Sequence, residues 1–590
     1  MVTIGHKRRP LRDGGGKPSP GRLPPSIRTR NTIAVLGSQI LQMCDYNHHK
    51  NNELATAADT LTYNTNGDNP IPAHHTEHTQ LLICNYTDTT AEVADGQPFL
   101  LHTMSALARQ AEDPDWEYPL MVEDGVNLGV DMDIDRSPDI WPTKEEMTGH
   151  AEPEEEPEPP TRHANYPSTT EHEEAITKTY LEECPVMVEG PYSEAQAARV
   201  CRCSPAELCH GALAGKPEGR YLDKLRTIHD ATVNRVNNWI QKHLHEKTTA
   251  PTLHDVLTAL HILDNTNVTL FKLDITKAHR RIKVRRADWK YITAKVGDHV
   301  WVNKCGTYGV SSAQYYWGRM AALTIRILYY LFPDILWAFV YVDDYIFILR
   351  GDTAPQLSMA IVVTMQALGC PISWKKTTMG EINNWVGFQI HAPNITAALT
   401  PDKQTIISGI LNKLKRAEQH SAKESMTLVG RLMWATAICL PMRPFLQPLY
   451  AWMLALNKRQ TRQKSYVYGR PPKDITLLAT VMLDLINSPP RSPMPPVALT
   501  DIKAATDAGA NDTDATVGGW YSTLASPAKH EVHWFCIPIT KQDHPWAYTK
   551  DTPKQSIAAI ELYATLLLLK HITSNSTLVN MTLPLHTDNM

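Results

Sequence analysis

The alternation of hydrophobic and polar positions becomes regular only after about residue 221, where apolar runs of strand and helix length begin. Residues 338–349 form two β-prone runs with two adjacent aspartates between them and no glycine or proline. This pattern predicts a β-hairpin that presents Asp343 and Asp344 at a tight turn. Another apolar run, residues 268–275, predicts a strand that ends at Asp274.

Beyond residue 400 the pattern changes to helical spacing. A helix-start signature at residues 400–403 precedes apolar positions three and four residues apart, and a second apolar stripe runs through residues 428–433. These stripes predict a helical unit over residues 393–490.

After a proline-rich break at residues 488–496 the pattern returns to strands. It predicts two paired strands, of which the first contains Asp507, and then a third strand. A helix that carries Glu561 and a strand that leads to Asp588 follow. We expect a separate α/β domain over residues 498–590.

The first 175 residues lack such periodicity. Residues 1–30 hold eight Lys and Arg and a single Asp among Gly and Pro, which predicts a disordered basic arm. We join it to residues 31–110, to which we assign no fold, as one segment over 1–110. Residues 111–175 are acidic and rich in proline, with the run AEPEEEPEPP at 151–160, and this composition predicts a linker without a core.

Composition narrows the class of protein. A chain of 590 residues is too long for one core, so we expect several compact units. The net charge of −4 hides a local excess of 16 Lys and Arg over 9 Asp and Glu between Gly215 and Val300, which suits a nucleic-acid partner. Ten scattered cysteines, no secretory signal and no uninterrupted apolar tract of membrane length predict an intracellular protein, cytoplasmic or nuclear, that is neither secreted nor membrane-spanning.

Two further groups leave alternatives open. Cys201, Cys203, Cys209 and His210 have metal-ligand chemistry, but their spacing fits no common zinc pattern and favours ordinary thiols. The basic tract at residues 280–286 alternates with apolar positions, which predicts either a strand that contacts backbone phosphates or a solvated edge strand.

The candidate chemistry lies in the acids. Two neighbouring aspartates in so apolar a stretch are costly to ionise unless a cation compensates them, and a hard divalent ion is the natural partner. Together with Asp274 they can converge on two Mg²⁺ ions roughly 3.5 to 4 Å apart, with Mn²⁺ as the alternative, as in phosphoryl transfer. Alone, Asp274 is more simply an exposed residue at a strand end.

In order and spacing these residues resemble the motifs of reverse transcriptases. Residues 341–344 (YVDD) resemble the third palm motif of that family, and residues 271–274 (FKLD) resemble the first. Residues 306–317 resemble the second, a loop that opens a helix beside the nascent base pair. The resemblance implies an α+β right-hand polymerase fold of fingers, palm and thumb, with the three aspartates as catalytic metal ligands.

The same resemblance implies further roles. Arg226 resembles the fingers arginine that grips the incoming triphosphate, a task suited to its guanidinium group. Lys376 resembles the lysine that protonates the departing pyrophosphate, with Lys375 as the second choice. Trp385 and Gly387 resemble the primer-grip hairpin.

Two positions depart from the family pattern. His279 lies where an aromatic ring usually excludes the sugar 2′-hydroxyl, so the choice of sugar stays open. Tyr308, followed by Gly309, lies where many retroviral members carry glutamine before the substrate-contacting glycine.

Residues 498–590 resemble ribonuclease H. Asp507, Glu561 and Asp588 match the first three carboxylates of that family, which implies a second two-metal site. The sequence stops at Met590, before a fourth acid, and this leaves cleavage activity open.

The resemblance implies a retrotransposon enzyme of the long-terminal-repeat or tyrosine-recombinase type. It would have a leader and fingers at 176–270, a palm at 271–392, a helical thumb and connection at 393–490 and the ribonuclease H-like part at 498–590. Its partners would be an RNA or DNA template with primer and deoxynucleoside triphosphates. The alternatives are a non-catalytic nucleic-acid-binding remnant and a nuclease that uses only the C-terminal acids; the oligomeric state is not predicted.

Overall fold

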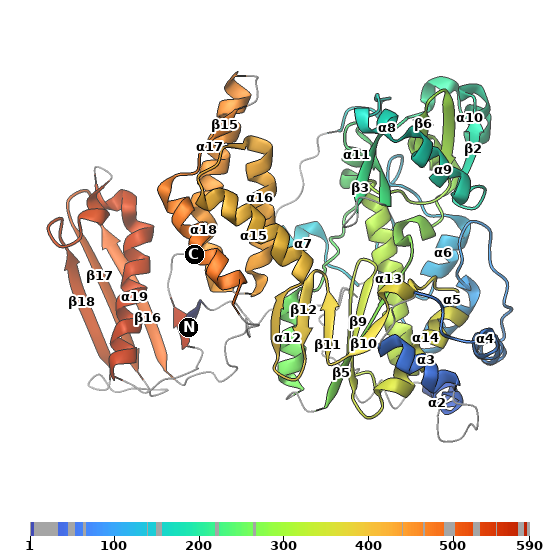
Figure 1. Cartoon of the computed structure of the whole chain (residues 1–590), viewed down its shortest axis with the longest axis horizontal. Helices are drawn as coiled ribbons and strands as arrows, with labels where there is room; N and C mark the ends of the chain where they lie inside the picture. The colour runs from blue at the N-terminus through green and yellow to red at the C-terminus, as the bar shows by residue number, and fades with distance from the viewer. Residues whose placement is uncertain are drawn as a thin grey trace. The chain divides into compact units, whose positions relative to one another are not determined.

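The computed structural model describes residues 2–4, 33–44, 53–62, 67–138, 140–148, 156–218, 224–263, 267–438, 440–463, 467–488, 502–522, 532–549, 552–575 and 583–586. The chain mixes helices and sheets (Figure 1) and divides into two compact units. The larger contains Leu11–Arg491, and the smaller joins Met1–Pro10 to Ser492–Met590.

The larger unit is organised around an antiparallel sheet in the order β10-β5-β9-β8. Its central strands are rich in β-branched and aromatic residues, and Phe271 and Phe347 stack as cross-strand partners with ring centroids 5.8 Å apart. Two long apolar helices, α13 and α14, pack against the sheet. The elements are β5 (Val268–Asp274), α13 (Ser311–Leu331), β8 (Trp337–Tyr341), β9 (Asp344–Arg350), α14 (Ala354–Ala367) and β10 (Thr378–Gly380).

An N-terminal group of helices covers α13 and α14. Residues 33–110, to which the sequence assigned no fold, form four helices whose buried side chains belong to the same hydrophobic core as the central sheet. The cover was missed because each helix is short and completes its core with residues far along the chain. The helices are α2 (Ala34–Met43), α3 (Glu53–Thr62), α4 (Ala73–Thr87) and α5 (Leu101–Gln110).

The prediction of a linker over residues 111–175 is wrong for much of that range. α6 (Tyr118–Asp124) and the segment after it bury Tyr118, Val122 and Trp141, each at most 3% exposed. The acids that suggested self-repulsion are instead paired: Asp113 accepts hydrogen bonds from Arg326, and Asp115 from Arg319. Because each buried carboxylate is paired with an arginine, these charges hold the segment on α13, whereas composition alone predicted that they repel one another.

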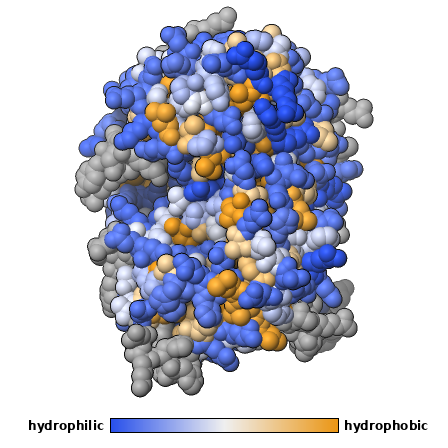
Figure 2. Space-filling model, turned by 90° about the vertical axis from the view of Figure 1, so that its right-hand side faces the viewer, coloured by the Kyte–Doolittle hydropathy of each residue, from blue (hydrophilic) through white to orange (hydrophobic). Residues whose placement is uncertain are grey.

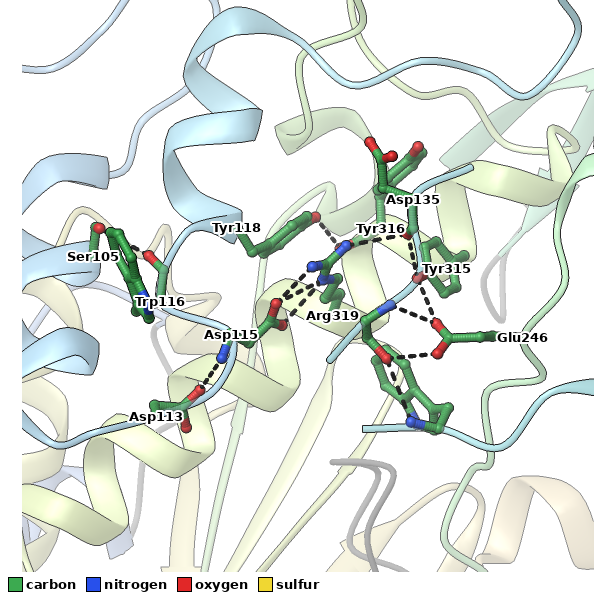
Figure 3. Close-up of polar contacts among 12 residues, drawn as sticks. Ser105, Asp113, Asp115, Trp116, Tyr118, Asp135, Glu246, Tyr315, Tyr316 and Arg319 are labelled. Carbon is green, nitrogen blue, oxygen red and sulfur yellow. Dashed lines mark hydrogen bonds and ion pairs between the residues drawn. The ribbon is translucent and has the colours of Figure 1, made fainter. Parts of the chain in front are cut away.

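Figure 3 shows the part of this buried polar network around Arg319 and Glu246. Arg319 of α13 donates three hydrogen bonds of 2.6 to 3.1 Å to Asp115, and its guanidinium carbon lies 4.5 Å from the ring centroid of Tyr118. One turn earlier on the same face of α13, Tyr315 donates to the carboxylate of Glu246, which also accepts from Ser137. Residues 113–137 are therefore fastened to α13 by charge as well as by packing.

Substitution of Gly37 in α2 tests whether this N-terminal helix packs closely on α13. A Cβ atom there would lie 1.8 Å from the carbonyl oxygen of Leu331 at the end of α13. We expect Gly37→Ala to lower the free energy of unfolding by about 2 to 4 kcal/mol, because either helix must shift in a close-packed core. Urea unfolding followed by tryptophan fluorescence measures the change.

The matched control is Gly430→Ala in α16 (Ala422–Ala435), where nothing lies within 4 Å of the added Cβ. This exposed helical glycine should gain up to about 1 kcal/mol on substitution. Equal effects at the two positions would contradict close packing of α2 on α13.

The chain before β5, and between β5 and α13, forms further elements. It contains a three-stranded sheet, β2-β7-β6, and the hairpin β3-β4. Its elements are α7 (Lys144–Thr148), α8 (Pro167–Glu171), α9 (Glu173–Glu183), β2 (Val188–Tyr192), α10 (Glu194–Cys201), η1 (Pro205–Glu207), β3 (Ala212–Glu218), β4 (Lys224–Asp230), α11 (Val236–His243), α12 (Leu253–Ile262), η2 (Ala278–Arg281), η3 (Arg286–Tyr291), β6 (Thr293–Val296) and β7 (His299–Asn303).

The last part of the larger unit is a short antiparallel sheet followed by helices. The sheet has the order β11-β12-β13, and α15 packs on α18. These elements are η4 (Trp374–Lys376), β11 (Ile382–Trp385), β12 (Phe388–His391), β13 (Thr396–Leu399), α15 (Pro401–Lys415), β14 (His420–Ser421), η5 (Thr436–Ile438), η6 (Leu440–Leu446), α17 (Gln447–Gln463), β15 (Tyr468–Gly469) and α18 (Lys473–Ile486), besides α16.

The smaller unit is a five-stranded sheet in the order β1-β19-β16-β17-β18 with α19 against it. Antiparallel pairing joins β16, β17 and β18, whereas β19 runs parallel to β16 and to β1. β1 lies in the stretch predicted as a disordered arm, of which residues 5–30 are outside the described residues. The elements are β1 (Val2–Ile4), β16 (Lys503–Ala510), β17 (Ala515–Ser522), β18 (His533–Ile539), η8 (Pro545–Tyr548), η9 (Pro553–Ser556), α19 (Ile557–Asn575) and β19 (Leu583–His586).

One helix among the described residues, Pro553–Ser574, is long and apolar enough by length and composition to cross a membrane. Its residues Ile560, Ala564, Leu568 and Ile572 recur every four positions and are at most 1% exposed, because they pack in the cores of the smaller unit. Elsewhere, the face drawn in Figure 2 shows hydrophobic side chains in separate groups among hydrophilic ones.

Candidate active site

Strand pairing brings the three predicted aspartates to one end of the central sheet. Asp274, the last residue of β5, is the register partner of Asp344, the first residue of β9. Asp343 occupies the turn between β8 and β9, and its carbonyl oxygen accepts a hydrogen bond of 3.1 Å from the backbone of Ile275. Two strands that are far apart in sequence thus end side by side with their acids together.

The turn is held in an unfavourable backbone conformation. Tyr341 pairs with Asp344, which leaves Val342 and Asp343 as the two-residue turn, and Val342 has a φ of +57°. A β-branched residue rarely adopts positive φ, and the strain costs about 1 to 3 kcal/mol. The indole nitrogen of Trp317 in α13 donates a 2.7 Å hydrogen bond to the carbonyl oxygen of Val342 and so helps to hold the turn.

Lys376 joins this group, whereas its neighbour Lys375 does not. The ammonium nitrogen of Lys376 donates a 2.7 Å hydrogen bond to Asp274 Oδ2. Burial raises the pKa of Asp274 to about 7, and the charges of Asp343 and Asp344 act in the same direction against Lys376. Burial, and then the charge of Asp344, also raises the pKa of Asp343. Burial and mutual repulsion therefore disfavour full ionisation of these acids in the absence of a further cation.

The donor set suits a hard divalent ion in its chemistry. Oδ1 of Asp344 is buried and accepts no hydrogen bond, although Lys272 Nζ lies 3.2 Å away as an ion pair. Carboxylate oxygens from three neighbouring aspartates are the donor type that Mg²⁺ and Mn²⁺ prefer. The residues present thus fit the expected metal.

Three metal-ligand atoms come within 4.8 Å of one another, among the described residues, only at Glu53, His74 and His75. These lie at the exposed or half-exposed beginnings of α3 and α4. The oxygens of the three aspartates are spread more widely, with Asp344 turned towards Lys272. Shared ligation by all three requires rotation of that side chain.

Trp385 packs beneath the aspartate hairpin. Its side chain is 1% exposed, its indole nitrogen donates a 3.3 Å hydrogen bond to the carbonyl oxygen of Asp344, and its ring meets that of Tyr341 edge to face. The buried ring supports the aspartate hairpin, and the primer-grip role expected for Trp385 and Gly387 stays a prediction. Gly387 lies in the β11–β12 turn with a φ of +82°, a conformation that favours glycine.

A second group of predicted residues assembles around Tyr308. The guanidinium carbon of Arg226, an exposed residue of β4, lies 5.1 Å from the centroid of the Tyr308 ring. His279 packs edge to face on the same ring at 5.5 Å. Burial, and then the charge of Arg226, lowers the pKa of His279 to about 4. The imidazole is therefore neutral at pH 7.

Gly309 completes this group because the chain leaves no room for a side chain there. Its φ is +108°, and a Cβ atom would lie 1.9 Å from the carbonyl oxygen of His229. The backbone of His229 in turn donates a 2.8 Å hydrogen bond to the carbonyl oxygen of Tyr308. The loop that carries Tyr308 and Gly309 is thereby fixed against β4.

The basic tract at residues 280–286 is not a regular strand. It contains η2 and the beginning of η3, and its cations are engaged within the protein. Lys283 donates to the carbonyl oxygen of Glu123, Arg285 pairs with Asp288, and Arg280 is buried. Both phosphate contact and a solvated edge are excluded for Arg280 by its 4% exposure.

The cysteines behave as buried thiols. Burial raises the pKa of Cys201 to about 12 and that of Cys209 to about 11. His210 has a lowered pKa of about 4, also through burial. Burial thus favours the neutral thiol form of both cysteines, and the preference for ordinary thiols over metal ligands stays a prediction.

The C-terminal acids are only partly described. Asp507 lies exposed in β16, and Glu561 is 8% exposed in α19, which packs on β16. Asp588 lies outside the described residues. The second metal site therefore stays a prediction.

No family model and no curated protein matches the sequence. Among solved structures, the foamy viral protease-reverse transcriptase with RNA/DNA hybrid shares 12% identity at a TM-score of 0.44, covering 91% of this chain and 63% of that one. The same viral protein with double-stranded DNA shares 11% identity at 0.39, covering 91% and 98%. Its dRH form, also with double-stranded DNA, shares 13% at 0.37, covering 73% and 64%.

In two of these comparisons the chain spans less than two thirds of the matched protein. Likenesses with such TM-scores assign neither a family nor an activity to this chain.

Sequence reasoning missed several residues that frame the two groups. Lys272 lies beside Asp344, and Glu183 and Tyr180 lie behind the His279 and Tyr308 loops. Lys272 could have been found, since alternation in β5 places it two residues before Asp274. The sequence around Glu183 did not indicate that this residue is buried, because it follows other acids in a helix whose composition predicts exposure to solvent.

Proposed function

We propose that this chain is a template-directed nucleotidyltransferase, specifically an RNA-directed DNA polymerase of a retroelement that uses the right-hand fold of fingers, palm and thumb. The observation that carries the proposal is the register of β5 with β9, which sets Asp274 beside Asp344 with Asp343 in the adjoining turn. This arrangement is suited to phosphoryl transfer. It combines two acids paired across strands, a third acid in the turn and a lysine that donates a hydrogen bond to Asp274.

Asp274, Asp343 and Asp344 are the residues that would hold Mg²⁺ or Mn²⁺. When bound, the two ions supply activation of the primer hydroxyl and neutralisation of charge on the triphosphate. Arg226 binds the triphosphate through its exposed guanidinium group. Tyr308 and Gly309 form the surface on which the nascent base pair rests, and neutral His279 faces the sugar.

Lys376 holds the proton for the leaving pyrophosphate. Burial opposes its charge, but the hydrogen bond to Asp274 and the nearby aspartates raise its pKa, so it is protonated at pH 7. We expect Lys376→Ala to lower kcat for nucleotide addition about a hundredfold, a typical contribution of general acid catalysis. Lys375→Ala, which removes the exposed neighbouring cation, should stay within about twofold of the native rate.

Primer extension tests the function itself. Native chain is incubated with Mg²⁺, deoxynucleoside triphosphates and a primer on poly(rA) or on a DNA template. Extension on both supports the proposal. Binding of primer–template without addition of any nucleotide would overturn it in favour of the non-catalytic remnant.

The smaller unit supports a second, narrower proposal. Its order of three antiparallel strands, a helix and a parallel strand agrees with a ribonuclease H-like domain, with Asp507 and Glu561 on adjacent elements. Cleavage of the RNA strand of a labelled hybrid, with and without Mg²⁺, tests it.

The partners proposed for the whole chain are template, primer and deoxynucleotides.

A further inference from the structure

Helix α9 precedes Arg226, the first of the motif residues, and packs behind the nucleotide-facing loops through one buried face. Tyr180 and Glu183 are one turn apart on the same face of α9. They are 3% and 8% exposed, respectively. Two polar side chains so buried must be satisfied by partners, and those partners identify what the helix supports.

Glu183 fastens the loop that follows Asp274. Its Oε1 accepts a 3.0 Å hydrogen bond from Lys277, and its Oε2 accepts hydrogen bonds from Nε of Arg280, at 3.1 Å, and from Nη2. His279 lies between these two cations in sequence. Although burial opposes ionisation, Arg280 and then Lys277 lower the pKa of Glu183. The carboxylate is thus charged and held by both cations.

Arg280 extends the connection to the loop of Tyr308. Its Nη1 donates a 2.8 Å hydrogen bond to Asn303 at the end of β7 and a 3.4 Å bond to the carbonyl oxygen of Gly306. A Cβ atom on Gly306 would lie 2.6 Å from the carbonyl oxygen of His279, so the two loops touch. One guanidinium group therefore fixes both loops relative to α9.

Tyr180 makes the equivalent connection to the strand of Arg226. Its hydroxyl lies 3.0 Å from Nε2 of His229, and its ring stacks on Trp301 at 5.3 Å. His229 belongs to β4, three residues after Arg226, and its backbone holds Tyr308 as described above. The same helix thereby braces all three segments that carry Arg226, His279 and Tyr308.

We infer that α9 fixes the geometry of the nucleotide pocket. Tyr180 and Glu183 are positioning residues for the binding of the incoming deoxynucleoside triphosphate and for the choice of its sugar. This inference rests on the proposed function and deepens it. Neither residue touches the nucleotide; each acts through the loops and strand that do. Removal of Glu183 leaves Lys277 and Arg280 without a counter-charge, which frees the loop of His279.

The test uses the full chain with Glu183→Gln and, separately, Tyr180→Phe, which removes a single oxygen and should fold. The chain is bound to a primer–template whose primer ends in a dideoxynucleotide, so that nucleotide affinity is measured without chemistry. Kd values for the next complementary deoxynucleotide and the matching ribonucleotide are then compared. The control is Glu182→Gln, the exposed neighbour on α9.

We expect Glu183→Gln to weaken deoxynucleotide binding about tenfold and to change the ratio of the two Kd values at least about threefold, with Tyr180→Phe smaller in the same direction. Affinity for primer–template should stay unchanged. If both variants lose thermal stability but keep native Kd values and ratio, the residues are structural only and the inference fails. If the native chain binds nucleotide but does not extend a free primer, the polymerase proposal fails and the inference on α9 stands. If the native chain does not bind nucleotide, both the polymerase proposal and the inference on α9 fail.

Discussion

Asp343→Asn and Asp344→Asn should each lower the rate of primer extension by about a thousandfold or more, equivalent to roughly 4 kcal/mol of transition-state stabilisation. Asparagine keeps the size of the side chain but removes one charge from the group that we propose holds the metal ions. The measurement is single-turnover extension with saturating Mg²⁺ and nucleotide, together with the Kd for primer–template, which should change little.

Asp352→Asn is the matched control for these variants. Asp352 is exposed in the loop after β9, on the same hairpin but away from its turn. Its substitution should leave the rate within about twofold of native. Native rates for either turn variant would remove these aspartates from the reaction, whatever the activity of the chain.

Asp113→Asn is expected to produce the largest loss of stability, about 3 to 5 kcal/mol, because it removes the buried charge that pairs with the half-buried Arg326. Asp113 is 1% exposed and accepts hydrogen bonds from Arg326 Nε at 2.6 Å and from the Tyr330 hydroxyl at 2.8 Å. Urea unfolding at pH 7 measures the difference. Glu117→Gln, an exposed acid of the same segment, should change stability by less than about 0.5 kcal/mol.

The pKa of Asp113 makes the free energy of unfolding depend on pH. Burial opposes ionisation of Asp113, but the charge and hydrogen bonds of Arg326 lower its pKa below the ordinary value. Since the folded pKa is depressed, the stabilisation is fully present above the unfolded pKa of about 4 and is lost as the pH falls through the folded value. The gap between native and Asp113→Asn should be constant from about pH 5 to 8 and shrink in more acid solution. A gap that widens in acid would contradict this pairing.

The aspartate hairpin could be predicted from the sequence because its determinants are local. Two apolar runs with acids between them allow few arrangements, and the strand ending at Asp274 has the same character. Pairing of β5 with β9 could be expected from the resemblance but not from the runs alone. The choice between Lys375 and Lys376 needed coordinates, since η4 directs only the second to Asp274.

The N-terminal cover could not be predicted because its partners are distant. Asp113 and Asp115 belong to an acidic stretch by composition, and nothing nearby indicates that arginines more than 200 positions later neutralise them. The burial of the Trp385 ring beneath Asp344 likewise could not be predicted from its motif. Composition and motif report chemistry, whereas exposure depends on the whole fold.

The separation of 204 positions between Asp115 and Arg319 has a consequence for biosynthesis. At 5 to 20 residues per second, a ribosome releases α13 on the order of 10 to 40 s after the segment that covers it. During that interval Tyr118, Val122 and Trp141 lack the helix on which they are buried. We therefore expect the nascent chain to engage chaperones in this window, and a fragment that begins near residue 222 to be produced as aggregates.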